Sequence, residues 1–372
     1  MHIGINAHLI SGEKSYRAAG IHGYLFNTLR YLPQVAPSTW QFTVMVSRIM
    51  AHHLSGLHIR RAYFDTSHPI KRIIWEQVLQ PFQLGAFDLY HAGAFVSPLI
   101  LSKPSVVTVY DLSFMHYPQA LTAARRLYLR MFTALSCRRA KRVIAISHST
   151  AQDLTASLDI PAEKIDIAPA GYDAERFYPQ HPADIAAFKV KKGLPDRFWL
   201  YLGTLEPRKN LITLIDAYAR LDKKLPLILA GGKGWLYDSI FERIQQYGLQ
   251  DMIRLPGFIP AEELPFWYNS AELFVYPSVF EGFGLPVLEA MACGTPVVVS
   301  DASSLPEVAQ GAGMLVPPHD VDAWVQALQT AYDDDAWRRH AAEQGITQAK
   351  QFTWLHTAQA TIRSYQNAQW KN

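Results

Sequence analysis

Short apolar runs alternate with segments of helical periodicity along the second half of the chain. The apolar runs are rich in β-branched and aromatic residues and predict strands at 198–205, 225–230, 253–258, 273–277, 296–300 and 314–316. Between them, apolar residues spaced three and four apart predict helices at 211–221, 237–247, 262–269, 285–292, 305–309 and 321–332. This alternation with short links is typical of a parallel sheet covered by helices on both faces.

The first half repeats the pattern less regularly. It predicts strands at 3–7, 42–46, 88–91, 105–110 and 142–146, and helices at 21–31, 74–79, 123–137 and 150–158. The segment 181–197, with two prolines, a glycine and several lysines, is interpreted as a connection. We therefore expect an α/β protein with two tandem Rossmann-like, doubly wound domains at 1–180 and 181–351, and a last helix in 352–372 that packs back on the first domain. Open sheets of this type bind ligands at the carboxyl ends of their strands, which would face a cleft between the domains.

Composition agrees with two folded domains and excludes several classes of protein. A chain of 372 residues suits two domains of about 100–200 residues each. With 49% hydrophobic and 18% charged residues, it is not a disordered chain. Two cysteines, Cys137 and Cys293, cannot build a disulfide framework, which predicts a reducing compartment. No signal peptide and no apolar stretch of roughly 18 residues is evident, so we expect a cytoplasmic protein.

Charge is distributed unevenly between the two halves. Residues 1–180 contain 18 lysines and arginines against 11 acidic residues, whereas residues 181–372 contain 17 against 21. The basic half indicates an anionic partner, or simply a solvated surface.

The segment GTLEPRKN, residues 203–210, follows a predicted strand and opens a predicted helix. Arg208 and Lys209 would then lie at a helix N-terminus, where cations are unfavourable beside the macrodipole unless an anion neutralises them. Asn210 is expected to cap the helix. The spacing alone does not distinguish a phosphate-binding site from a solvated pair of cations at Arg208 and Lys209.

The segment EGFGLPVLEA, residues 281–290, also links a strand to a helix. Gly282 and Gly284 allow a tight turn whose N–H groups can approach a ligand. A continuous helix would put Glu281 and Glu289 roughly 12 Å apart along its axis, against about 5–5.5 Å for a retaining glycosidase pair. The spacing suits two carboxylates that hold different parts of an elongated ligand, such as two sugars. The alternative is that Glu281 is an ordinary turn residue and Glu289 a carboxylate on the helix surface. The apolar sequence around Glu289 disfavours this alternative, because a buried carboxylate needs a partner.

Two segments of the first half carry candidate chemistry. The strand in VVTVYDLSFMHYP ends at Tyr110 and Asp111, with His116 just beyond, so these side chains could bind a sugar hydroxyl or move a proton. An ordinary loop histidine is the favoured interpretation of His116. Residues 125–142, from Arg125 to Arg142, hold seven cations and no acidic residue. We expect their apolar stripe to be core, and the cations to favour an anionic bilayer or an anionic acceptor.

Other patterns are weak or absent. Gly20 and Gly23 open a predicted helix, but no G-x-G-x-x-G fingerprint and no Walker A pattern occurs. The histidines are scattered, and neither cysteine lies in a C-x-x-C pair. The acidic residues at 320, 322 and 333–335 are explained by helix capping. We therefore expect no metal site.

Taken jointly, these motifs resemble the family 4 glycosyltransferases of the two-Rossmann (GT-B) type. Glu281 and Glu289 match the E-x7-E motif of that family, and Arg208 and Lys209 match its basic pair. The similarity extends to the glycine turn near Gly20, AISHSTAQDL, APAGYD, PGF and SDASSLPEVAQGAG, so it covers nearly the whole chain.

The resemblance implies transfer of a hexose from a nucleotide sugar with retention of configuration, without a metal or other cofactor. It implies that Arg208 and Lys209 neutralise the diphosphate, with help from backbone N–H groups at the following helix start. Glu281 would hold the donor sugar and act with the two cations as the catalytic group, and Glu289 would hold the ribose. The implied donor site comprises Gly20, Thr204, Arg208, Lys209, Phe258, Ile259, Glu281, Gly282, Phe283, Gly284, Leu285 and Glu289.

Two positions depart from the family pattern. Tyr110 stands where many members have histidine, and Thr204 stands where some have arginine. The sequence GTLEPRKN resembles the corresponding segment of family members that make bacterial surface polysaccharides, often from GDP-mannose. The implied partners are a nucleotide sugar and a glycan or lipid-linked acceptor, with no nucleic acid, and the protein would lie peripherally on the inner face of the membrane. A non-catalytic nucleotide or sugar binder and a nucleotide-sugar epimerase are the alternatives.

Overall fold

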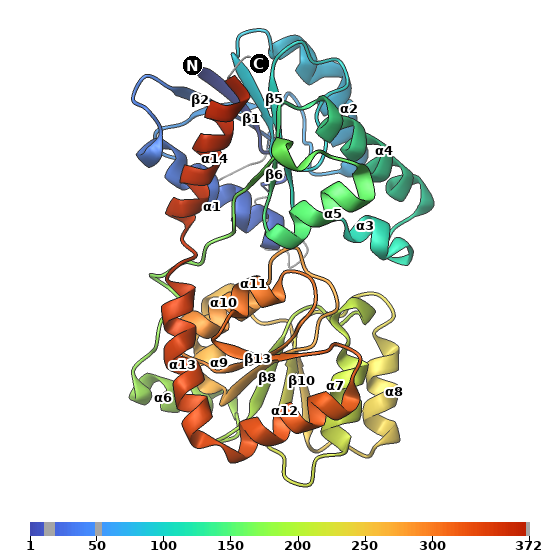
Figure 1. The fold of residues 1–372 in the computed structure, drawn as a ribbon, viewed down its shortest axis with the longest axis vertical. Coiled ribbons are helices and arrows are strands. Elements are labelled where there is room, and N and C mark those ends of the chain that lie inside the picture. The colour runs from blue at the N-terminus through green and yellow to red at the C-terminus, as the bar shows by residue number, and fades with distance from the viewer. Residues whose placement is uncertain (11–18, 49–53, 370–372) are drawn as a thin grey trace. The chain divides into compact units, whose positions relative to one another are not determined.

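The computed structural model describes residues 1–10, 19–48 and 54–369 (Figure 1). The chain divides into two compact units. Unit 1 is Met1–Gly171 with Thr353–Asn372, and unit 2 is Tyr172–Phe352. The division falls at Gly171, nine residues before the boundary expected at 180, and the C-terminal helix belongs to unit 1.

Unit 1 contains a parallel sheet in the order β3-β2-β1-β4-β5-β6-β7. Its strands are β1 (His2–Asn6), β2 (Gln41–Val46), β3 (His58–Arg61), β4 (Leu89–Ala92), β5 (Ser105–Val109), β6 (Arg142–Ala145) and β7 (Ile165–Ile167). The edge strands β3 and β7 were not predicted. Both are short, and the HIRR sequence of β3 lacks an apolar run because an edge strand is only partly covered.

Helices cover both faces of this sheet. The main ones are α1 (Ala19–Val35), α2 (Pro69–Ile74) with the π-helical turn η2 (Trp75–Leu79), α4 (Ala123–Arg139), α5 (His148–Leu158) and α14 (Trp354–Gln369). Alternate strand residues point to opposite faces. Ile3 and Ile5 therefore join a core with α1 and α14, whereas Val107 and Val109 join a core with α4 and α5.

Unit 2 contains a second parallel sheet, in the order β10-β9-β8-β11-β12-β13. Its strands are β8 (Trp199–Leu202), β9 (Leu227–Ala230), β10 (Ile253–Gly257), β11 (Leu273–Tyr276), β12 (Val297–Ser300) and β13 (Gly313–Val316). The runs LILA and VVVS are fully buried, as expected for strands covered on both faces.

Two groups of helices lie against the second sheet, on opposite faces (Figure 1). One group is α7 (Leu211–Ala219), α8 (Asp238–Gln246) and α12 (Val321–Asp333). The other is α6 (Pro182–Lys192), α9 (Leu264–Ser270), α10 (Leu285–Ala292), α11 (Leu305–Ala309) and α13 (Asp335–Ala349). Two doubly wound, Rossmann-like units are thus confirmed.

Helix α6 corrects the interpretation of 181–197 as a connection. His181 caps its first turn by accepting a hydrogen bond from the Ala183 N–H, Pro182 fills the first helical turn, and Gly193 ends the helix at φ +60°. Proline at the start of a helix and glycine just past its end are typical of helix boundaries. Both residues are also common in linkers, which is why the segment was interpreted as a connection. Helix α13 was not predicted either; Asp334 caps it, just as Asp320 caps α12.

The strand orders place one reversal point in each sheet. Successive connections run outward from β1 in one direction and from β4 in the other, and the same holds for β8 and β11. The carboxyl ends of such neighbouring strands are where open α/β sheets bind ligands. Among the helices of the described residues, none has the length and apolar character that a membrane crossing requires.

Candidate functional site

The two motifs of unit 2 come together at the β8–β11 reversal point. GTLEPRKN follows β8, with Arg208 and Lys209 in the 3-10 turn η6 (Pro207–Lys209) before α7. EGFGLPVLEA follows β11 and leads into α10. Because β8 and β11 are adjacent parallel strands, both loops emerge at the same sheet edge.

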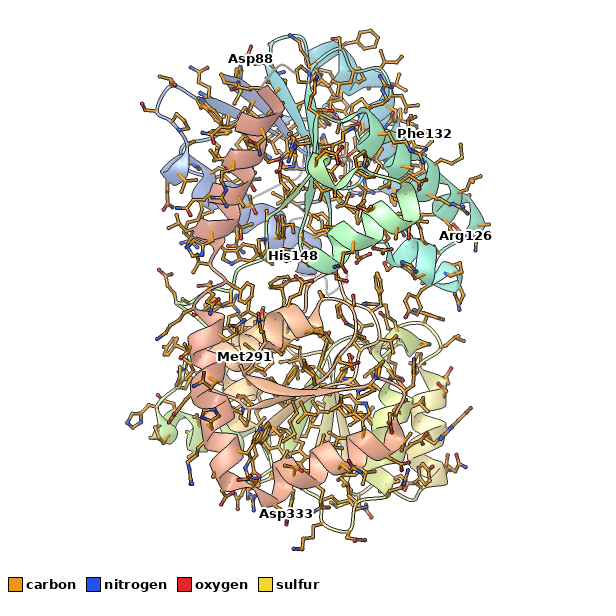
Figure 2. The ribbon with its side chains drawn as sticks, in the orientation of Figure 1. Asp88, Arg126, Phe132, His148, Met291 and Asp333 are labelled. Carbon is orange, nitrogen blue, oxygen red and sulfur yellow. The ribbon has the colours of Figure 1, made fainter. Side chains whose placement is uncertain are left out.

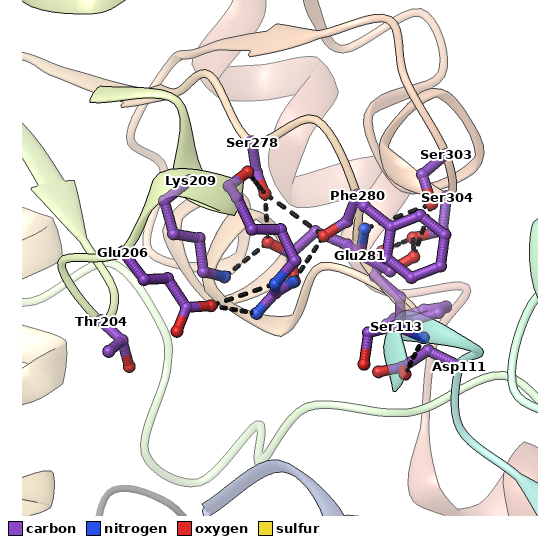
Figure 3. Close-up of polar contacts among 12 residues, drawn as sticks. Asp111, Ser113, Thr204, Glu206, Lys209, Ser278, Phe280, Glu281, Ser303 and Ser304 are labelled. Carbon is purple, nitrogen blue, oxygen red and sulfur yellow. Dashed lines mark hydrogen bonds and ion pairs between the residues drawn. The ribbon is translucent and has the colours of Figure 1, made fainter. Parts of the chain in front are cut away.

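A buried ion pair joins the two motifs (Figure 3). Lys209 Nζ lies 2.5 Å from Glu281 Oε1 and donates to the Tyr276 hydroxyl at 2.7 Å. The same carboxylate oxygen accepts hydrogen bonds from Ser278 at 2.6 Å and Tyr276 at 3.1 Å. Lys209 is only 6% exposed, so the pair is held almost without water.

Burial and charge act in opposite directions on this pair. Burial alone would raise the pKa of Glu281, but Lys209 and Arg208 outweigh it and hold that pKa at about 2. Burial lowers the pKa of Lys209, and Glu281 opposes that shift. Glu281 is therefore a carboxylate at neutral pH, and an anion arriving at Lys209 would further favour the ammonium form.

Arg208 bridges the pair to a second carboxylate. Its Nη2 lies 2.7 Å from Glu206 Oε1, its Nη1 lies 3.3 Å from Glu281 Oε2, and it donates to the Phe280 carbonyl at 2.5 Å. Two cations thus face two carboxylates, and the formal charge of this cluster is zero. The sequence interpretation did not include Glu206, so it overstated the positive charge available to a ligand.

The loop before α10 is fixed by hydroxyl groups and one glycine. Ser303 and Ser304 donate to the Glu281 carbonyl at 2.7 and 3.0 Å (Figure 3). Gly284 has φ +110°, and a Cβ there would lie 2.7 Å from Leu305 Cδ2. Only glycine combines this backbone conformation with this close approach.

The start of α10 carries unused donors. Among the described residues, no acceptor receives a hydrogen bond from the backbone N–H groups of Phe283, Gly284 or Leu285. Such N–H groups at a helix N-terminus favour anions. Because α10 begins at Leu285, Glu281 lies in the preceding loop, and the condition of a continuous helix in the spacing estimate is not met.

Asn210 does not cap α7 as expected. It is in the left-handed region at φ +56°, and its side-chain N–H2 donates to the carbonyls of Pro277 and Pro318. It therefore ties the β8 loop to the β11 loop.

Glu289 lies within α10 and is partly exposed. Its Oε2 accepts a hydrogen bond from the Tyr268 hydroxyl at 2.9 Å. Burial raises its pKa to about 7, although the Tyr268 hydrogen bond and the charge of Arg176 lower it. Glu289 is therefore poised between its two protonation states, unlike Glu281.

The remaining donor-site candidates line the same sheet edge. Thr204 follows β8, and its carbonyl accepts a hydrogen bond from the Tyr201 hydroxyl at 3.0 Å. Phe258 and Ile259 follow β10; Phe258 is 52% exposed, whereas Ile259 is buried. A Cβ on Gly231 would lie 1.8 Å from the Gly203 carbonyl oxygen, so glycine is required where the β8 and β9 loops meet.

The candidates of unit 1 lie at its own sheet edge. Tyr110 is buried, and its hydroxyl donates to the Gly93 carbonyl at 2.8 Å. Asp111 accepts a hydrogen bond from the Ser113 N–H at 2.8 Å (Figure 3), and His116 Nε2 lies 2.8 Å from Asp153. Gly20 is in the first turn of α1, where a Cβ would meet nothing within 4 Å.

The basic helix α4 corrects one expectation. Three residues of its apolar stripe are not core, since Leu127, Met131 and Leu135 are 58%, 57% and 40% exposed, whereas Tyr128 and Phe132 are partly buried. The buried face is formed instead by Thr133, Ser136 and Cys137. Arg126 and Phe132 mark this helix in Figure 2. Small residues against the sheet, with leucine and methionine outside, reverse the usual pattern.

The sequence interpretation missed several residues that complete the site. Glu206, Tyr276, Ser278, Ser303 and Ser304 all contact the two motifs. Tyr276 and Ser278 flank the end of a predicted strand beside Glu281, so their positions carried a signal. The serines at 303 and 304 follow another strand, β12, and only the sheet order brings them close.

Two family profiles match the chain. The profile "Glycosyltransferase Family 4" matches residues 20–176, and "Glycosyl transferases group 1" matches residues 184–348. The chain is 36% identical over 282 residues to O-antigen chain mannosyltransferase B of Escherichia coli, covering 74% of both proteins. It is 30% identical over 317 residues to D-inositol 3-phosphate glycosyltransferase of Arthrobacter sp. (strain FB24), covering 79% of this chain and 73% of that protein. Serotype-specific mannosyltransferase WbdA of E. coli is 36% identical, but the match spans 61% of this chain and 29% of WbdA.

Solved structures show the same fold. Sucrose-phosphate synthase from Thermosynechococcus elongatus has a TM-score of 0.77 at 22% identity, covering 98% of both chains. Anabaena HepE, in complex with UDP and glucose, has a TM-score of 0.76 at 20% identity, covering 98% of this chain and 99% of that one. These likenesses show the GT-B fold, and the profile matches confirm the resemblance carried by the two motifs. The chain therefore belongs to the family 4 glycosyltransferases and is a glycosyltransferase enzyme.

Proposed function

We propose that this enzyme is a retaining hexosyltransferase that needs no metal and transfers mannose from GDP-mannose to a glycan or lipid-linked glycan during polysaccharide synthesis. The observation that carries the proposal is the buried Arg208–Lys209–Glu281 cluster at the β8–β11 reversal point. The mannosyl donor and the glycan acceptor are suggested by the names of the E. coli O-antigen relatives.

Fixed positive charge takes the place of a metal ion at the diphosphate. Departure of a nucleoside diphosphate develops negative charge on its oxygens, and preorganised donors stabilise that charge without reorganisation. Arg208, Lys209 and the free N–H groups at the start of α10 provide such donors. The two carboxylates beside the cations balance their charge, so a diphosphate would compete with partners that are already present.

Glu281 then has two states in the cycle. Without ligand it accepts from Lys209, Tyr276 and Ser278. When a diphosphate engages the ammonium group, the carboxylate is released to accept a hydroxyl of the donor sugar. Glu289, on the following helix turns, is placed for the ribose hydroxyls, and Phe258 for the face of the base.

Nucleotide binding without metal tests the donor half of the proposal. A ligand that binds the folded state at 100 times its dissociation constant stabilises it by about 2.7 kcal/mol. Thermal unfolding with GDP, UDP and ADP in EDTA should show a rise in melting temperature, largest for GDP. No rise with any nucleotide would refute the proposal, and a larger rise with UDP would change the donor.

Product analysis tests the reaction. GDP-mannose and a mannosyl acceptor in EDTA should yield GDP and an α-linked product, which the anomeric carbon–proton coupling in NMR identifies. Saturable binding with no release of nucleoside diphosphate would instead indicate a binding protein. A converted sugar with no acceptor consumed would indicate an epimerase.

We also propose that α4 contacts an anionic membrane surface peripherally. Leu127, Met131 and Leu135 form an exposed apolar stripe, and the same helix carries Arg126, Arg130 and further cations. Apolar side chains flanked by arginines suit the boundary of an anionic bilayer. Met131→Gln should weaken binding to anionic vesicles, whereas Val190→Gln, at an 84% exposed site on α6, should not. Equal binding of wild type to neutral and anionic vesicles would contradict the proposal.

A further inference from the structure

Unit 1 contains a small pocket that the donor site does not use. It lies at the carboxyl edge of the first sheet and has a volume of about 50 Å³. Asn6, Arg72, Glu76, Phe95 and Tyr128 line it together with aliphatic side chains. The pocket is small, and its size suits a small group such as a hydroxyl or hydroxymethyl group.

A buried carboxylate faces this pocket. Glu76 is 9% exposed, and its Oε1 accepts a hydrogen bond from Asn6 Nδ2 at 2.9 Å. No other described residue donates to this carboxylate. A carboxylate can accept about four hydrogen bonds, and a buried one is costly without them. Burial accordingly raises the pKa of Glu76, while Arg72 opposes the shift.

The backbone at two lining residues of the pocket has an uncommon conformation. Glu76 lies in the π-helical turn η2, a feature that is rare and frequent at functional sites. Phe95, which also lines the pocket, has φ +56°. Non-glycine residues held in this region cluster at ligand sites. The ring of Phe95 packs on Tyr110 and Phe114, which fixes its position.

The pocket lies at the reversal point of the first sheet. Asn6 is the last residue of β1, and Phe95 follows the end of β4. Because β1 and β4 are the adjacent strands at which the connections reverse, this is the place where an open sheet binds a ligand. A mixture of polar and apolar lining side chains is also the composition of a small-molecule subsite.

We propose that this pocket receives one hydroxyl-bearing arm of the acceptor glycan, with Glu76 accepting a hydrogen bond from the acceptor hydroxyl and Asn6 orienting the carboxylate. The inference rests on the proposed transfer to a glycan and adds a specificity-determining residue to it. An acceptor that lacks this hydroxyl would leave the Glu76 carboxylate buried and short of donors, so it would be rejected.

Glu76→Gln tests the inference with GDP-mannose as donor and octyl α-mannopyranoside as acceptor. Glutamine keeps the hydrogen bond from Asn6 but removes the charge. Hydrogen bonds to charged groups are worth about 1.5–3 kcal/mol, which corresponds to about a 10–100-fold change. The KM for the acceptor should therefore rise about 10–100-fold, while stabilisation by GDP and hydrolysis of GDP-mannose without acceptor stay unchanged. The control Glu163→Gln, at an exposed turn of the same unit, should leave all three unchanged.

A second variant keeps the test decisive if Glu76→Gln is destabilised. Ala94→Leu adds apolar volume at another lining residue of the pocket and leaves Glu76 itself unchanged, and it should raise the acceptor KM by a similar factor. An unchanged acceptor KM in the folded variants, or a loss in kcat and melting temperature alone, would overturn the inference and leave a structural Glu76–Asn6 pair. If wild type neither binds GDP nor transfers mannose, the proposed function itself fails.

Discussion

The Lys209–Glu281 pair allows a quantitative test of how the donor site is held together. We consider Lys209→Met and Glu281→Gln, which remove one charge each and preserve the approximate length of the side chain. Removing one partner of a buried ion pair typically costs about 3–5 kcal/mol because the other charge stays buried. Lys209→Met leaves Glu281 beside Arg208 at 3.3 Å, so its cost should be about 3 kcal/mol.

Glu281→Gln should cost more. It leaves Lys209, which is 6% exposed, with the Tyr276 hydroxyl as a remaining acceptor, so we expect about 4–5 kcal/mol. The double variant contains neither buried charge and should cost much less than the two single costs together. The expected coupling energy is about 3 kcal/mol. Interaction energies of contacting residues reach about 3 kcal/mol. The pKa of Glu281 agrees in sign, because Lys209 and Arg208 together lower it to about 2 against the effect of burial.

Urea unfolding of the four proteins, followed by tryptophan fluorescence, measures this coupling. The sign of its pH dependence is fixed: Glu281 has a depressed pKa in the folded state, so its stabilisation is complete above about pH 4.5 and is lost as the pH falls towards 2. Single costs that add to within about 0.5 kcal/mol at pH 7 would mean that the residues do not interact. That result would refute the buried pair and the charge balance derived from it.

Three further predictions concern protonation and backbone. The raised pKa of Glu289 implies that wild-type stability falls as the pH rises from about 4.5 to 7, so Glu289→Gln should be more stable by about 2–3 kcal/mol at pH 8 and nearly equal at pH 4; an equal difference at both values would contradict this. Gly284→Ala should lower stability by about 1–3 kcal/mol, because the new side chain meets φ +110° and a clash with Leu305. Gly23→Ala in α1 should raise stability by about 0.5–1 kcal/mol, because alanine favours the helix and its Cβ meets nothing within 4 Å. Thermal unfolding distinguishes the two signs. Burial lowers the pKa of His91 to about 3, so wild type should lose about 2 kcal/mol between pH 6.5 and 4.5, and His91→Asn should show a shallower slope. Parallel slopes would exclude a neutral buried histidine.

The sequence predicted the parallel sheets well because buried strands are continuous apolar runs. β9 and β12, with LILA and VVVS, are examples. It failed where burial is partial or one-sided. The edge strand β3 has the polar sequence HIRR, and α4 places Leu127 and Met131 outside while Ser136 and Cys137 face the core. Composition alone cannot reveal which side of such a helix meets the sheet.

The sequence predicted the two charged motifs of the site but not the net charge of the cluster that they form. Arg208, Lys209 and Glu281 were identified from motif and position, and the structure brings them into contact. Loop geometry decides that Glu206 pairs with Arg208 and that Glu281 pairs with Lys209. The sequence does not reveal these two ion pairs. The pocket around Glu76 was likewise invisible, because Asn6 and Glu76 are 70 residues apart in the chain.

Helix α14 has a consequence for how the protein is made. Unit 1 is closed by residues that follow unit 2 in the chain, since Ala358, Ile362 and Tyr365 complete the core beneath α1. Gly171 and Thr353 meet so closely that a Cβ on Gly171 would lie 2.4 Å from the Thr353 carbonyl carbon, so the chain departs and returns at one point. On a ribosome, unit 2 is entirely synthesised before unit 1 can bury its last apolar face. The N-terminal part of unit 1 therefore stays incompletely packed while unit 2 is translated.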